Sequence, residues 1–151
     1  MTRIGLISDT HGLLRPEVMA FLSGCDHIVH AGDICDPSVL DQLSKLAPVT
    51  AVRGNNDRGE WAERLPVTEF LQIADAYFYV IHDQAEMDID PRAAGVRIVI
   101  SGHTHSPSIA ERNAVLYVNP GSAGPRRFQL PIAAAEVIIH EGSVTARVKE
   151  F

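Results

Sequence analysis

The chain has 151 residues, of which 46% are hydrophobic and 21% are charged. This composition excludes an intrinsically disordered protein, and the length suffices for one domain with its own core, over residues 1–151. The 13 Lys and Arg against 19 Asp and Glu give a formal net charge of −6. Duplex nucleic acid is therefore not an expected partner, because its binding depends on clustered basic side chains.

The two cysteines, Cys25 and Cys35, are too few for a disulfide framework and indicate a reducing compartment. The N-terminal residues lack the apolar stretch and cleavage site of a signal peptide, and no apolar run reaches membrane-spanning length. We therefore expect a cytoplasmic protein that does not associate with membranes.

The first half of the sequence predicts strands that alternate with helices. Residues 4–8, 27–32 and 49–53 are short apolar runs typical of buried strands. Between them we expect helices at residues 16–22 and 37–46, each with a proline in its first turn.

The second half predicts more strands and fewer helices. The strands are expected at residues 67–73, 76–81, 96–100, 115–118, 133–140 and 143–148. Two-residue turns make the first two and the last two of these antiparallel hairpins. One short helical piece is expected at residues 90–95, between an Asp-Pro start and a glycine. Helix-linked strands followed by hairpins predict an α/β fold with two packed sheets and helices outside.

Polar residues whose side chains can bind a metal ion follow the predicted strands. They are Asp9, His11, Asp33, Asn55, His82, His103, His105 and Asn119. Ligands of α/β sheets bind beyond the carboxyl ends of the strands, so these side chains are expected to converge. Carboxylate, imidazole and amide oxygen without thiolate form the ligand set of a divalent metal such as Mn, Fe, Zn, Mg or Ni.

Seven of these donors, all but Asn119, are too many for one metal and suit two ions that share a carboxylate. Asp33 is the expected bridge, because its two oxygens can bind both ions. Each ion would take one of the paired histidines, His103 and His105. An extended backbone around Thr104 would point both of these rings to the same side of the chain.

The order of these residues resembles the calcineurin-like metallophosphoesterase superfamily. The matching motifs are Asp-x-His at 9–11, Gly-Asp at 32–33, Gly-Asn at 54–55, a lone His82 and Gly-His-x-His at 102–105. The resemblance extends from about Ile4 to Arg127, and the short chain with Asn-Pro-Gly-Ser at 119–122 is similar to the compact bacterial and archaeal phosphodiesterases. It implies a four-layer αββα sandwich of two mixed sheets flanked by helices.

The resemblance also implies roles for the site residues. The first ion would be held by Asp9, His11, Asp33 and His105, and the second by Asp33, Asn55, His82 and His103. Mn²⁺ is the leading metal, with Fe, Zn, Ni or Mg as alternatives. The implied activity is hydrolysis of a small phosphate diester by a metal-bridging hydroxide, with Asp33, Asn55 and Asn56 as catalytic residues.

Two positions depart from the family pattern. Many members have a histidine where this chain has Asn56, so protonation of the leaving group lacks its usual residue. Compact members often have a glycine where this chain has Asp83, an extra carboxylate beside the site. Arg126 and Arg127 are candidate contacts for the substrate phosphate, together with Asn56.

Several alternatives remain open at this point. The same metals could support a phosphomonoesterase or nucleotidase, and the fold could serve as a non-catalytic metal-binding scaffold. Residues 55–57 could form only a turn, since Asn and Asp tolerate left-handed backbone. His30 lies close enough in sequence to support Asp33. Hairpin edges and exposed aromatic residues make a homodimer or homotetramer an expectation.

Overall fold

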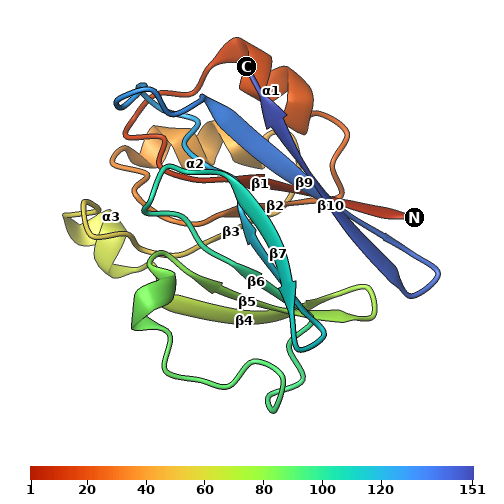
Figure 1. The fold of residues 1–151 in the computed structure, drawn as a ribbon. Coiled ribbons are helices and arrows are strands. Elements are labelled where there is room, and N and C mark those ends of the chain that lie inside the picture. The colour runs from red at the N-terminus through yellow and green to blue at the C-terminus, as the bar shows by residue number, and fades with distance from the viewer.

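A computed structural model describes all 151 residues, and two five-stranded sheets pack face to face in it (Figure 1). The strands are β1 (Thr2–Ile7), β2 (His27–His30), β3 (Val49–Ala51), β4 (Thr68–Ile73), β5 (Ala76–Ile81), β6 (Ile98–Ile100), β7 (Ser108–Arg112), β8 (Val115–Asn119), β9 (Ala133–His140) and β10 (Ser143–Glu150). The helices are α1 (Pro16–Leu22), α2 (Pro37–Ser44), α3 (Glu60–Glu63) and the 3-10 turn η1 (Gln84–Glu86). Both sheets are mixed, which confirms the predicted fold class.

The first sheet has the order β10-β9-β1-β2-β3. Strands β1, β2 and β3 are parallel because α1 and α2 carry the chain back between them, and β9 joins β1 in the antiparallel sense. Helix α2 starts where expected, because the Asp36 carboxylate accepts a hydrogen bond from the Ser38 N–H at 2.9 Å. It ends at Ser44, two residues earlier than predicted.

The second sheet has the order β4-β5-β6-β8-β7. Strands β5, β6 and β8 are parallel, and the β4–β5 hairpin turns through Ala74, whose φ is 53°. Strand β7 was not predicted. All five of its residues are exposed, so it lacks the alternation of buried and exposed positions that identifies a strand in a sequence.

Three apolar layers hold the molecule together. The central layer lies between the sheets and includes Leu6, Val29, Phe78 and Ile100. The second layer joins the outer face of the first sheet to α1 and α2. These layers exclude water from both faces of the first sheet, and such burial drives folding.

The third apolar layer covers the outer face of the second sheet, where Met87 and Ile89 of the 82–97 segment pack on Tyr79 and Val99. This segment contains η1 but no α-helix. The helical piece expected at residues 90–95 is wrong, because those residues form a turn closed by a 3.0 Å bond from the Ala94 N–H to the Asp90 carbonyl. The hydrogen bonds that follow go from the Gly95 N–H to Arg92 and from the Val96 N–H to Pro91, so the helical spacing is not continued.

The loops after β1, β2, β3, β5 and β6 meet at one edge of the sandwich, where their backbones are hydrogen bonded to one another. The Asp9 N–H donates to the Gly32 carbonyl at 3.0 Å, and the Gly102 N–H donates to the His82 carbonyl at 2.9 Å. None of the helices has the length and apolar character that crossing a lipid bilayer requires.

Candidate metal centre

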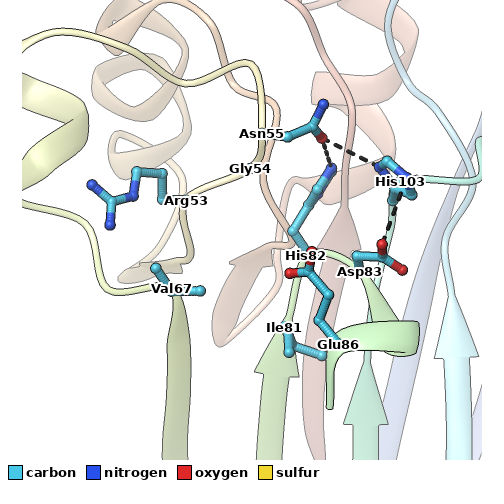
Figure 2. Close-up of a pocket in the computed structure, with 9 residues that line it drawn as sticks. All are labelled: Arg53, Gly54, Asn55, Val67, Ile81, His82, Asp83, Glu86 and His103. Atoms are coloured by element: carbon cyan, nitrogen blue, oxygen red, sulfur yellow. Dashed lines mark hydrogen bonds and ion pairs between the residues drawn. The ribbon is translucent and has the colours of Figure 1, made fainter.

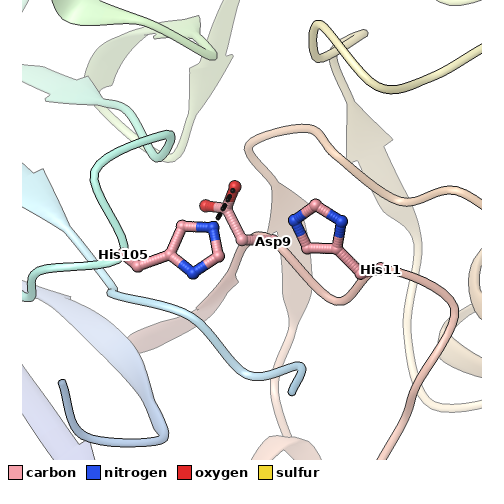
Figure 3. A group of neighbouring side chains, drawn as sticks. All are labelled: Asp9, His11 and His105. Atoms are coloured by element: carbon pink, nitrogen blue, oxygen red, sulfur yellow. Dashed lines mark ion pairs between the residues drawn. The ribbon is translucent and has the colours of Figure 1, made fainter. Parts of the chain in front are cut away.

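Three of the predicted ligand side chains form a first group at this edge, with Asp9 between His11 and His105 (Figure 3). One ligand atom from each residue lies within 4.8 Å of the others, and Asp9 Oδ1 is 3.4 Å from His105 Nε2. Asp9 Oδ1 and His11 Nε2 are both buried without a hydrogen-bond partner. Buried polar atoms are rarely left unpaired, so a cation fits this group.

A second group combines His82 with two carboxylates and one amide. His82 Nε2 is 3.5 Å from Asp33 Oδ2, 3.8 Å from Asp9 Oδ1 and 3.1 Å from Asn55 Oδ1. His103 Nδ1 lies 3.2 Å from the same Asn55 oxygen, so both rings point to it (Figure 2). Imidazole and oxygen donors in this arrangement suit a second divalent ion.

Two carboxylates connect the groups. Asp33 Oδ2 is 3.6 Å from His11 Nε2 and 3.5 Å from His82 Nε2, so it lies between a ring of each group. Asp9 belongs to both groups as well. The sequence predicted only Asp33 as a bridge, whereas the geometry places both carboxylates within reach of both groups.

Burial and neighbouring groups move the pKa values of these residues. Burial raises the pKa of Asp9, and attraction to His82 offsets only part of this effect. Burial also opposes ionisation of Asp33, but hydrogen bonds from His82 and Asn56 outweigh it and lower the pKa of Asp33. Burial would depress the pKa of His82, yet Asp33 and Asp9 raise it, whereas burial lowers the pKa of His105. Asp33 is therefore the more firmly ionised of the two carboxylates.

The backbone at the centre is left-handed at most of the ligand positions. The φ angles are 54° at Asp9, 46° at His11, 55° at Asp33, 70° at His103 and 62° at His105. The extended backbone expected around Thr104 is therefore wrong, and His103 and His105 point to different groups. Such conformations cost energy in residues other than glycine and concentrate at functional sites.

Asp57 connects two loops of the centre, whereas the sequence predicted only a turn at this position. Its buried carboxylate accepts hydrogen bonds from the N–H groups of Asp33 at 3.0 Å, Gly54 at 2.8 Å and Cys35 at 2.8 Å. It thereby ties the loop after β2 to the loop after β3. The only sequence signal was a third polar residue after Asn55 and Asn56.

The sequence predicted that His30 would support Asp33. Instead, the His30 side chain forms hydrogen bonds with the loops and not with the Asp33 carboxylate. His30 Nδ1 accepts the Gly32 N–H at 3.1 Å, and His30 Nε2 lies 3.0 Å from the Thr10 hydroxyl. Burial lowers the pKa of His30 to about 3, so it is neutral. Asn119 is likewise occupied by the Gly102 carbonyl and the Thr104 hydroxyl, both at 3.0 Å.

The residues predicted to bind substrate differ in their positions. Asn56 is exposed and donates from its backbone and its side chain to Asp33, at 2.9 and 2.8 Å. Burial lowers the pKa of His105, and the positive charge of Arg127, an exposed residue, adds to this effect. Arg126 instead donates to the Leu130 carbonyl at 3.4 Å.

A pocket of about 220 Å³ opens beside the second group (Figure 2). Its lining residues are Arg53, Gly54, Asn55, Val67, Ile81, His82, Asp83, Glu86 and His103.

Two mixed sheets with this group of Asp, His and Asn side chains at their strand ends define the metallophosphoesterases, a class of metal-binding hydrolases. The chain belongs to the calcineurin-like phosphoesterase superfamily, whose domain model matches residues 2–142.

Sequence relatives agree with this family, and solved structures share the fold. A probable metallophosphoesterase of Methanocaldococcus jannaschii is 39% identical over 132 residues, which is 79% of this chain and 67% of that protein. A phosphodiesterase of the same organism is 29% identical, over 79% of this chain and 82% of its own. A solved archaeal phosphodiesterase superposes with a TM-score of 0.81 at 23% identity, covering 98% of this chain and 100% of its own. Vps29 of Entamoeba histolytica, solved with Zn²⁺, gives 0.75 at 24% identity, with 99% of each chain covered.

Proposed function

We propose that the protein is a phosphodiesterase that hydrolyses a small phosphate diester at a centre of two divalent ions. The observation that carries this proposal is the pair of buried, unpartnered ligand atoms, Asp9 Oδ1 and His11 Nε2, beside a second group of donors. The 29% identical relative named a phosphodiesterase supports the preference for diesters.

In this proposal each ion has four protein ligands. Asp9, His11, Asp33 and His105 hold the first ion, and Asp33, Asn55, His82 and His103 hold the second. Mn²⁺ is the proposed metal, and Fe, Zn, Ni or Mg would also suit these donors. Two carboxylates cannot neutralise two divalent ions, so the centre attracts an anionic substrate despite the net charge of −6.

When bound, the ions stabilise charge on the phosphate oxygens and activate water for attack on phosphorus. Asn56 donates a hydrogen bond to each oxygen of Asp33, which favours the ionised form of this carboxylate. Arg127, whose positive charge acts on His105 of the first group, is proposed to contact the phosphate. Asn56 cannot supply a proton to the leaving group in place of histidine, so substrates with good leaving groups should react faster.

The proposal also covers the substrate, the partners, the cellular compartment and the assembly. The substrate is a small phosphate ester, duplex nucleic acid is not a proposed partner, and the compartment is the cytoplasm. The edge strand β4 carries Phe70, which is 47% exposed and lies 5.5 Å from Tyr77 between ring centroids. Such edges make a homodimer or homotetramer our proposal for the assembly.

The test compares a diester with a monoester on metal-reconstituted protein. We expect Mn²⁺-dependent hydrolysis of bis(p-nitrophenyl) phosphate, slower hydrolysis of p-nitrophenyl phosphate, and two bound ions per chain by elemental analysis. Asp33→Asn should lower the diester rate by at least about 100-fold, because it weakens both ion sites. Asp36→Asn is the matched control, since Asn caps α2 as well as Asp does.

Each alternative gives a different result. Faster hydrolysis of the monoester would favour a phosphomonoesterase or nucleotidase. Metal binding without hydrolysis of either ester would favour a scaffold. Activity that survives complete chelation would contradict the proposed mechanism.

A further inference from the structure

The carboxylate of Asp83 faces one of the proposed ligands of the second ion. Asp83 Oδ2 is 3.7 Å from His103 Nε2, the ring nitrogen on the side away from Asn55 (Figure 2).

The orientation of His103 assigns different tasks to its two ring nitrogens. Nδ1 points to the Asn55 oxygen that His82 also approaches. In a neutral imidazole only one nitrogen carries a proton, and the other has a lone pair for a cation. If Nε2 carries the proton and directs it to Asp83, Nδ1 is free to bind an ion.

His103 needs such a partner more than the other histidines of the centre. Its side chain is 42% exposed, against 6% for His82 and 5% for His105. His82 is already fixed, because its Nδ1 lies 2.7 Å from the Ala31 carbonyl and leaves Nε2 for the ion. The His103 ring packs edge-on against the His82 ring, with 5.2 Å between the ring centroids. Its Nε2 atom faces Asp83.

Asp83 is itself held in place. Its second oxygen accepts the Ala85 N–H at 3.0 Å and caps η1, so the carboxylate cannot turn freely into solvent. Only 28% of this side chain is exposed. Glu86 lines the same pocket with the same charge, but it makes no ion pair with His103.

We propose that Asp83 is a positioning residue that orients His103 and fixes the proton on Nε2, so that Nδ1 binds the second ion. A carboxylate that accepts the outer N–H of a metal-binding histidine strengthens the metal site, commonly by 10- to 100-fold in affinity. This inference rests on the proposed two-ion centre. It adds a residue of this chain that acts through His103 and does not touch the ion.

The test measures Mn²⁺ binding by calorimetry in four variants. Asp83→Asn keeps the cap on η1 but presents an N–H to His103, so we expect the weaker of two Mn²⁺ sites to lose about 10-fold or more in affinity. Glu86→Gln, the matched control, removes one charge from the same pocket and should change affinity less than 2-fold. In a His103→Ala background, Asp83→Asn should have no further effect on Mn²⁺ binding.

A second measurement determines which nitrogen of the His103 ring carries the proton. In metal-free protein, ¹⁵N shifts of the His103 ring should show the proton on Nε2 in the wild type and a shift toward Nδ1 in Asp83→Asn. Equal losses of affinity in Asp83→Asn and Glu86→Gln would overturn the inference, because charge alone would then explain both. An undiminished effect of Asp83→Asn in the His103→Ala background would also overturn it.

The outcomes separate this inference from the proposed function. Two ions in the wild type with unchanged Mn²⁺ affinity in Asp83→Asn would overturn the role of Asp83 and leave the two-ion centre intact. Fewer than two ions in the wild type would overturn both.

Discussion

Asn56 matters at the centre for two reasons. It donates hydrogen bonds to Asp33, and it stands where a histidine could act as a proton donor. Its backbone N–H and its side-chain amide each donate to one oxygen of Asp33. An amide does not titrate near neutral pH, so Asn56 can orient Asp33 but cannot protonate an alkoxide. In the proposed mechanism, Asn56 therefore links the geometry of the metal centre to the choice of substrate.

Replacing Asn56 with His should broaden the range of leaving groups. General acid catalysis contributes about 10²- to 10⁴-fold where the leaving group is poor. We expect Asn56→His to raise kcat/KM for a diester with an alkyl leaving group by at least about 10-fold relative to an aryl diester. Asn56→Gln retains an amide without the acid and is the control. An unchanged ratio between the two substrates in Asn56→His would show that protonation by residue 56 is not what restricts the reaction.

At the residue level, the structure brings together the side chains that the sequence grouped by residue type, and their role as metal ligands stays a prediction. The seven predicted ligands all lie at one edge, because each follows a strand and the parallel strands end together. Asp57 was missed because its task depends on three backbone N–H groups from two loops. The left-handed backbone at His103 and His105 was missed because non-glycine residues seldom adopt it.

At the level of the elements, buried strands were predictable and exposed ones were not. Strands β1, β5 and β6 carry buried apolar runs, whereas β7 is exposed throughout and exists because it pairs with β8. A proline in the first turn made helices α1 and α2 predictable from the sequence. Helix α3 spans only four residues and has no side-chain cap, so no local signal marks it.

The first sheet also contains a charge cluster that connects distant elements. On β9, Glu136 accepts hydrogen bonds from Arg147 Nε on β10, at 3.0 Å, and from Arg3 on β1, and Arg147 Nη2 forms an ion pair with it at 2.8 Å. Arg3 in turn donates to the Phe21 and Ser23 carbonyls at the end of α1. Burial opposes ionisation of Glu136, but these two arginines outweigh it and lower the pKa of Glu136.

Glu136→Gln should therefore destabilise the protein in a pH-dependent way. The Glu136 side chain is 12% exposed, so we expect a loss of about 1–3 kcal/mol in the free energy of unfolding at pH 7. A lowered pKa gives stability that is fully present above the unfolded value of 4.5 and is lost as pH falls through the folded value. The difference between wild type and variant should thus shrink below about pH 4.5.

Urea unfolding of both proteins from pH 7 to pH 3 measures this difference. Glu111→Gln is the control, because Glu111 is 62% exposed and its 3.7 Å pair with Arg97 lies at the surface. We expect a change below about 0.5 kcal/mol there. A Glu136→Gln loss that stays constant down to pH 3 would contradict the electrostatic origin.

At the scale of the whole molecule, the metal centre lies where the two sheets meet. Asp9, His11 and Asp33 follow strands of the first sheet, and His82 and His105 follow strands of the second. An ion bound by both sets would tie the sheets together at this edge. The unfolded chain cannot assemble these ligands, since they are spread over nearly a hundred positions, so binding should stabilise only the folded state.

Mn²⁺ should therefore raise the unfolding temperature of the entire domain. A ligand at 100 times its Kd adds about 2.7 kcal/mol to the free energy of unfolding, which corresponds to roughly 5–10 °C for a domain of this size. Calorimetric scans at increasing Mn²⁺ should show one transition that moves upward and returns on chelation. His82→Ala should lose most of the shift, whereas His140→Ala, at a side chain that is 59% exposed, should retain it. If both variants shifted equally, Mn²⁺ would be acting elsewhere, and the centre would not be what joins the two sheets.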